Sequence, residues 1–238
     1  MRNPDSAFRS VAEAAARRYA PAGRFAMHYA LGKLRHDPVF AAIFAHGLIP
    51  DRARLVDLGC GQGLLLALVV AANDAIARAE WPAGWPAPPR PQSMIGFDAG
   101  QRATALARIA LGGQARIAQA DLRTVELPAC DTIALIDVLQ YVDAAAQEAA
   151  LAKCARALTA GGVLLLRVND AGAGWSAALT RLSDQLATVA RDRKWPRLHD
   201  RPLTDWIALL ERAGFDVRTL PASAGTPFAN SLLVGRRS

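Results

Sequence analysis

The sequence predicts an α/β protein in which one sheet of mainly parallel strands is covered by helices on both faces. Short apolar runs alternate with longer helical stretches from residue 53 onward, which is typical of strands buried on both sides. The 238 residues are 52% hydrophobic and 21% charged, so the chain can bury one large core. Aspartates end several apolar runs, which indicates a ligand site at one edge of the sheet.

Residues 1–50 precede this alternation and are predicted to be helical. Their alanine-rich first half has Ser6 as its expected N-cap, and a second helix is expected to begin at Asp37 and end at Gly47. We expect this segment to form a helical cap on the domain built by residues 51–238, and the two to make one structural unit.

In the alternating part of the chain, the period of the apolar residues predicts the type of each element. Glycines or charged residues at the ends of each apolar run predict where the element stops. Strands are expected at 54–59, 93–98, 115–121, 131–137, 162–170, 215–220 and 228–237. Helices are expected at 62–80, 99–113, 144–162, about 175–193 and 204–215. The last helix has Thr204 as its expected cap and Gly214 at its end.

Residues 81–92, WPAGWPAPPRPQ, interrupt the pattern between the first of these helices and the second strand. Five prolines exclude both a helix and a central strand, because proline has no amide hydrogen to donate. We interpret the segment as an inserted surface loop, either a removable polyproline-like decoration or a lid or partner-docking element.

Charge, cysteine and histidine content narrow the class of protein. The net charge of +7 comes from both flanks, since residues 55–180 hold nine Lys and Arg against eleven Asp and Glu. Such flanks suit a solvated face, or an anionic substrate or partner. The three cysteines are widely spaced without a CxxC pair, and the four histidines lack metal-ligand spacing. Buried free thiols and no metal are therefore expected.

Nothing in the sequence predicts a membrane span or a signal peptide. The longest apolar run, 64–72, is about half the length that a transmembrane helix needs. The first twenty residues carry charges where a signal peptide has its apolar middle. A cytoplasmic protein is expected.

The stretch LVDLGCGQG at 55–63 is the strongest motif. It places Asp57 at the end of a buried strand, followed by a glycine-rich bend that leads into a helix. Glycines let the backbone turn sharply and lie against a ligand. The carboxylate disfavours a pyrophosphate and suits a ligand with a cationic amine, and a dinucleotide site is the alternative.

Aspartates also end the next three predicted strands. Asp98 lies 35 residues after Gly63, whereas dinucleotide sites have their ribose-binding acid about 20 residues on, and the proline-rich insert accounts for the difference. Asp121 follows the third strand and Asp137 ends the fourth. A single aspartate at a strand end is usually a turn former. Four aspartates at the ends of four successive strands instead predict a ligand that lies across the carboxyl ends of the strands.

In order and spacing, the stretches LVDLGCGQG, IGFDAG, AQADL, DTIALIDVLQYV and LTAGGVLLLRV resemble the class I S-adenosylmethionine-dependent methyltransferase family. The resemblance covers about residues 52–170, and the closing strands fit the antiparallel hairpin of that family. It implies a Rossmann-like, seven-stranded sheet of order 3-2-1-4-5-7-6 with strand 7 antiparallel. It also implies S-adenosylmethionine as the cofactor and S-adenosylhomocysteine as the product.

The resemblance further implies residue roles. The motif glycines would lie under the methionine portion with Asp57 near its amine. Asp98 would bind the ribose hydroxyls, Asp121 the adenine amino group, and Asp137 would line the sulfonium side. The full set of implied cofactor-binding residues is Asp57, Gly59, Cys60, Gly61, Gly63, Asp98, Ala99, Asp121, Leu122, Asp137 and Val138.

Candidates for contact with the acceptor are less well defined. Many relatives have a histidine just after the fourth strand, where this chain has LQYV. Tyr141 and His199 are the catalytic candidates, with packing and capping roles as the alternatives. Lys33 is a candidate for contact with the methionine carboxylate of the cofactor, with a solvated surface position as the alternative. Asn169 and Arg167 could face the acceptor, although Arg167 could instead pair with an acid.

We therefore expect a methyltransferase that acts on oxygen or carbon of an aromatic or acyl small molecule, with anionic and carrier-bound acceptors both open. The stretches YALGKLRHDPVF and RLHDRPLTDWIALLERAGF are similar to methyltransferases of polyketide and aryl-polyene pathways, which points to secondary metabolism. An RNA methyltransferase is the main alternative, yet no N/D-P-P-Y/F motif or RNA-binding module is present. A nicotinamide oxidoreductase and a non-catalytic cofactor-binding homologue are the others.

Overall fold

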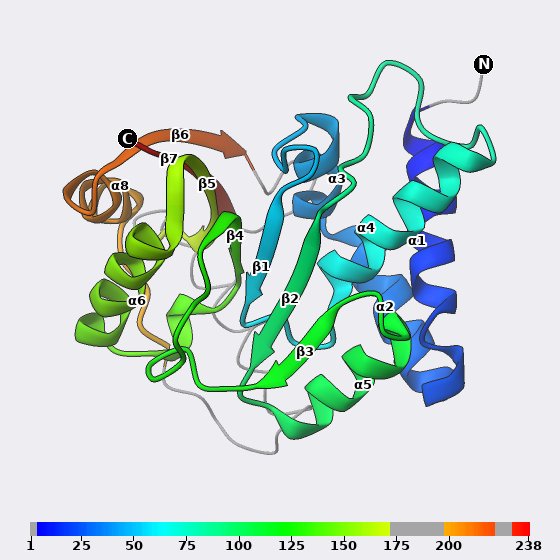
Figure 1. Cartoon of the computed structure of the whole chain (residues 1–238), viewed down its shortest axis with the longest axis horizontal. Helices are drawn as coiled ribbons and strands as arrows, with labels where there is room; N and C mark the ends of the chain where they lie inside the picture. Colours follow the sequence, from blue (N-terminus) through cyan, green and yellow to red (C-terminus); the bar gives the residue numbers. More distant parts are fainter. Residues whose placement is uncertain (1–3, 172–197, 222–229) are drawn as a thin grey trace.

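A computed structural model of the protein describes residues 4–171, 198–221 and 230–238 (Figure 1). Within these ranges one sheet contains β1 (Arg54–Leu58), β2 (Ser93–Asp98), β3 (Arg116–Gln119), β4 (Cys130–Ile136), β5 (Leu158–Asn169), β6 (Phe215–Pro221) and β7 (Asn230–Arg237). The order across the sheet is β3-β2-β1-β4-β5-β7-β6, and β7 is antiparallel to both of its neighbours. The predicted fold class, strand order and antiparallel seventh strand are confirmed.

Helices cover both faces of this sheet (Figure 1). One face carries α1 (Pro4–Arg17), α2 (Arg24–His36), α3 (Pro38–Ala45), α4 (Leu64–Ala77) and α5 (Gln101–Leu111). The other face carries α6 (Ala144–Ala157) and α8 (Leu203–Arg212). Among the helices described, none has the length and apolar character that a bilayer crossing requires.

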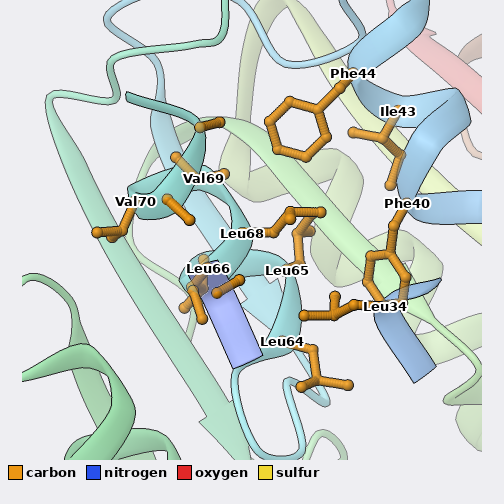
Figure 2. Packing of buried hydrophobic residues seen from close by; sticks show 14 of the residues in the cluster. Leu34, Phe40, Ile43, Phe44, Leu64, Leu65, Leu66, Leu68, Val69 and Val70 are labelled. Carbon is orange, nitrogen blue, oxygen red and sulfur yellow. The ribbon is translucent and has the colours of Figure 1, made fainter. Parts of the chain in front are cut away.

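Each face of the sheet has its own apolar core, and β5 contributes to both. Val163 and Leu165 pack toward α1–α5, whereas Leu164 and Leu166 pack toward α6 and α8, as the two-residue period of a strand requires. α4 is buried on nearly every side, because it lies between the sheet and the N-terminal helices (Figure 2). The segment before residue 50 is thus part of the main core.

Two predicted helix caps are wrong. α1 begins at Pro4, so Ser6 lies inside the helix. α8 begins at Leu203 after Pro202, so Thr204 also lies inside. Pro4 is the first residue of α1, where the fixed φ of proline suits the first helical turn, whereas Pro202 is the N-cap residue of α8.

The helix predicted at 144–162 is too long. α6 ends at Ala157, and Leu158 is already extended and paired with Cys130 of β4. The strand after α6 therefore begins four residues earlier than expected. By contrast, α3 begins as predicted, because the Asp37 side chain accepts a hydrogen bond from the Val39 amide at 3.2 Å. The helix predicted at about 175–193 lies outside the described residues.

The proline-rich segment 81–92 packs at the amino end of the sheet. The Arg90 carbonyl accepts a hydrogen bond from the Arg52 amide, and the Ala53 carbonyl accepts one from the Gln92 amide, just before β1. The two tryptophans of the segment pack against phenylalanines of α1 and α3, with ring centroids 5.2 and 5.8 Å apart. The segment lies opposite the carboxyl edge and does not cover it, and a partner-docking role stays a prediction.

Deleting residues 82–91 is expected to destabilise the fold, contrary to the view of the segment as a removable decoration. The deletion removes Trp85 from its contact with Phe8, and loss of a packed tryptophan alone costs about 3 kcal/mol or more. Urea unfolding measures the loss, with Ala83→Ser and Ala87→Ser, two exposed positions of the same loop, as controls. Unchanged stability of the deletion variant would refute the structural role.

Candidate functional site

The glycine-rich loop between β1 and α4 forms the centre of the site. Gly59, Gly61 and Gly63 all have positive φ, at 82°, 53° and 75°. A Cβ on Gly59 would lie 2.4 Å from a methyl group of Val138. The first motif glycine is therefore required both by backbone conformation and by the close approach of the segment after β4.

The end of β2 holds this loop in place. The Phe97 carbonyl accepts hydrogen bonds from the amides of Gly59 and Cys60, at 2.7 and 2.9 Å. The Asp98 carboxylate accepts from the Gly61 amide at 2.8 Å and from the Gly100 amide at 2.7 Å. A carboxylate has about four lone-pair sites, so Asp98 can orient the loop and still accept hydrogen bonds from a ligand.

Asp57 is buried beneath the loop, with 4% of its surface exposed. Among the described residues, no group donates a hydrogen bond to its carboxylate. Burial, with a smaller contribution from the charge of Asp98, raises the pKa of Asp57 to about 7. Since a buried carboxylate without a partner is costly, the site is built for a cationic group.

The four predicted strand-end aspartates lie along one edge, in the spatial order Asp121, Asp98, Asp57 and Asp137. The Asp121 carboxylate pairs with the Arg123 guanidinium at 2.5 Å, and this hydrogen bond lowers the pKa of Asp121. The family resemblance implies that Asp121 binds the adenine amino group. A ligand bound in this way would share the Asp121 carboxylate with Arg123.

The other implied cofactor residues also lie at this edge. The Ala99 carbonyl, just after β2, accepts a hydrogen bond from the Gln119 amide group. Leu122 is half-buried and packs against the core under α6. Cys60 lies in the loop itself, and burial raises the pKa of its thiol. All three cysteines of the chain are buried and free, as predicted.

Asp137 belongs to a partly buried ion cluster that the sequence did not reveal. Its carboxylate contacts the Lys33 ammonium at 3.3 Å and the Arg167 guanidinium at 3.0 Å. Both cations also contact Asp37, at 2.7 and 2.6 Å. Burial disfavours the charged form of Asp37, but the Arg167 and Lys33 charges outweigh it and lower the pKa of that carboxyl. We call Lys33, Asp37, Asp137 and Arg167 the ion cluster.

The ion cluster shows which of its two expected roles Arg167 has. Arg167 pairs with acids, one of its two expected roles, and Lys33 is half-buried and committed to two carboxylates. A signal was present, since a single arginine inside the apolar run of β5 has to find an acidic partner. Its partner on the N-terminal helices, 130 positions away, could not be read from spacing.

A second contact ties the N-terminal helices to the glycine-rich loop. Tyr19, just after α1, is fully buried, and its hydroxyl donates a hydrogen bond to the Gln62 carbonyl at 2.7 Å. No motif marks this tyrosine, because it lies in a different part of the chain from the loop that it holds.

The structure brings the two catalytic candidates near each other. Tyr141 is the last residue of a 3-10 turn after β4, Leu139–Tyr141. The His199 amide donates to the Gln140 carbonyl at 2.8 Å, and the Gln147 side chain donates to the His199 carbonyl at 2.7 Å. Both candidates therefore lie beside the carboxyl edge, and their roles in catalysis stay predictions.

A glycine-rich loop over an unpartnered, buried carboxylate, with aspartates at successive strand ends, defines a site of the class I methyltransferase type. A family model described as a methyltransferase domain matches residues 26–220. The chain belongs to this family, whose class I members take their methyl group from S-adenosylmethionine. No curated protein matches the sequence.

Solved structures with a similar fold include several O-methyltransferases. An O-methyltransferase family protein from Burkholderia thailandensis has 21% identity and a TM-score of 0.63 over 92% of this chain and 60% of its own. An O-methyltransferase family 2 protein from Planctomyces limnophilus, solved with apigenin, has 17% identity and a TM-score of 0.62 over 89% and 60%. Mitomycin 7-O-methyltransferase MmcR has 22% identity and a TM-score of 0.62 over 92% and 58%. The chain thus spans about three fifths of their length, and the likeness is one of fold.

Proposed function

We propose that the protein transfers a methyl group from S-adenosylmethionine to oxygen or carbon of a small aromatic or acyl molecule. The observation that carries the proposal is the Asp57 carboxylate, which is buried and without a hydrogen-bond donor among the described residues. The ammonium group of S-adenosylmethionine would supply the missing cationic partner. Membership of the methyltransferase domain family supports the same reading.

The described residues fit this cofactor. Gly59 leaves space that a side chain would fill, Asp57 would hold the ammonium group, and Asp98 would accept from the ribose hydroxyls while it orients the loop. When bound, S-adenosylmethionine supplies a methyl carbon activated by a positively charged sulfur.

The protein has to align the acceptor with this methyl carbon and exclude water. Asp137 and Val138 would line the reacting side, and the ion cluster fixes Asp137 through two cations. Where the acceptor is a hydroxyl, its proton has to leave as the new bond forms. His199 and Tyr141 are the candidates to receive or relay that proton.

The fold neighbours support a small acceptor. One is solved with the flavone apigenin, and another methylates a mitomycin oxygen. The test is transfer of labelled methyl from S-adenosylmethionine to a panel of phenols, enols and acyl thioesters. Transfer to RNA alone would instead favour the nucleic-acid alternative, which the basic flanks suit.

The affinity for S-adenosylhomocysteine is expected to rise about tenfold between pH 6 and pH 8. Because the pKa of Asp57 is about 7 in the free protein, the carboxyl has to lose a proton before it can pair with the ligand's ammonium. Titration calorimetry in two buffers of different ionisation enthalpy measures both the affinity and the released proton. A flat pH profile would show that Asp57 does not contact the ammonium.

A further inference from the structure

Asn169, the last residue of β5, has a buried side chain whose two polar atoms have no hydrogen-bond partner among the residues that the structure describes. Only 4% of its surface is exposed. A carboxamide that is buried without partners destabilises the folded state, and in native proteins such a group calls for an explanation. Asn73 of α4 shows the usual situation, since its amide group donates to two carbonyls, at 2.8 and 2.9 Å.

The strand geometry locates Asn169 at the reacting side of the site. Alternate residues of a strand share a face, so Asn169 lies on the same face as Arg167, one step nearer the carboxyl edge. Ile136 of β4 pairs with Arg167, so Asp137 is level with Val168. Neighbouring strands are about 4.8 Å apart, which places the carboxamide next to the segment expected to line the sulfonium.

The charges around Asn169 indicate what it can bind. Each cation of the ion cluster contacts two carboxylates, and the four charges balance. The carboxamide itself is neutral and offers donors on Nδ2 and an acceptor on Oδ1. It therefore matches a neutral group that both donates and accepts hydrogen bonds, rather than an ion.

We propose that Asn169 binds and orients the methyl acceptor, and that the acceptor is a hydroxyl flanked by a carbonyl oxygen or a second hydroxyl. The inference rests on the proposed function and adds the acceptor chemistry to it. Oδ1 accepts from the reacting hydroxyl, and Nδ2 donates to the flanking oxygen. As the oxygen–methyl bond forms, the sulfur–methyl bond breaks and its electron pair stays on sulfur. The hydroxyl proton leaves to water or a nearby base, because an amide cannot take it up.

The test compares Asn169→Leu with Asn73→Leu, the same change at an asparagine whose amide group is hydrogen-bonded. Asn169→Leu is expected to raise the melting temperature of the free protein by about 3 °C, whereas Asn73→Leu lowers it. Binding of S-adenosylhomocysteine to Asn169→Leu should stay within about threefold of wild type. Methyl transfer to 2-hydroxyacetophenone or 1,2-dihydroxybenzene should fall about 30-fold or more in kcat/KM.

The outcomes separate this inference from the proposed function. Wild-type protein that does not bind S-adenosylhomocysteine would refute the proposed function itself. Binding without transfer to either phenol would refute the acceptor class assigned here. A lower melting temperature for Asn169→Leu, or unchanged transfer, would overturn the role of Asn169 and leave the proposed function intact.

Discussion

Asp57→Asn is expected to weaken binding of S-adenosylhomocysteine by about 100-fold, because it removes the charge that would pair with the ligand's ammonium group. A factor of this size corresponds to about 2.7 kcal/mol, within the range of hydrogen bonds to charged groups. Asparagine has nearly the shape of aspartate, so the loop above it can keep its conformation. Titration calorimetry measures the change.

The same variant is expected to be more stable than wild type at pH 8. Burial raises the pKa of Asp57 to about 7, whereas the carboxyl ionises near pH 4 in the unfolded chain. Between about pH 4 and pH 7 the folded protein therefore holds the extra proton, and its stability falls as the pH rises through this window. Above pH 7 the penalty is complete, and asparagine removes it, with about 4 kcal/mol as the upper bound. At pH 4 the two proteins should melt alike.

Asp74→Asn is the matched control, since Asp74 is exposed on α4 and the change should alter neither affinity nor stability. An Asp57→Asn variant that keeps full affinity, or that melts lower than wild type at pH 8, would contradict the assignment of Asp57 as an unpartnered buried carboxylate.

Arg167→Met is expected to lower the free energy of unfolding by about 3–5 kcal/mol at neutral pH. Arg167 is 4% exposed and contacts both Asp37 and Asp137, so its removal leaves two carboxylates to share the ammonium of Lys33. Chemical denaturation measures the loss. Below about pH 4 the loss should shrink, because protonated carboxyls no longer need the missing charge.

Two further variants test whether charge is the cause. Arg218→Met, at an exposed arginine of β6, should have little effect. Adding Asp37→Asn to Arg167→Met should recover part of the loss, because it removes one uncompensated charge while asparagine can still cap α3. If Arg167→Met lowers the free energy of unfolding by less than about 1 kcal/mol, the ion cluster stabilises the fold no more than an exposed salt bridge does.

Local patterns in the sequence were enough to locate most of the fold and the sheet edge where the predicted site lies. Each strand is an apolar run with its own boundaries, and the glycine-rich loop and Asp98 lie at the ends of two successive strands of that pattern. The helix starts predicted from Ser6 and Thr204 were misplaced because a hydroxyl residue is a common N-cap, whereas α1 begins at Pro4 and α8 begins just after Pro202.

The rest depends on contacts between distant parts of the chain. The ion cluster joins α2 and α3 to the ends of β4 and β5, and Tyr19 joins α1 to the glycine-rich loop. The tryptophans of residues 81–92 pack on phenylalanines of the N-terminal helices. No regular sequence spacing relates the two members of any of these pairs. The composition of the proline-rich segment therefore predicted that it is a loop, but not which residues it packs against.

Among the strands that the structure describes, β7 is synthesised after the other six, yet it lies inside the sheet, between β5 and β6. It pairs with residues Val163 to Asn169 of β5, which lie about sixty residues earlier in the chain. Ribosomes add about 5–20 residues per second, so the edge of β5 stays unpaired for roughly 3–12 s during synthesis. An apolar strand with an open edge can pair with a neighbouring chain. The nascent protein is therefore vulnerable to aggregation in this interval, and slow translation or a shortage of chaperones should reduce its yield.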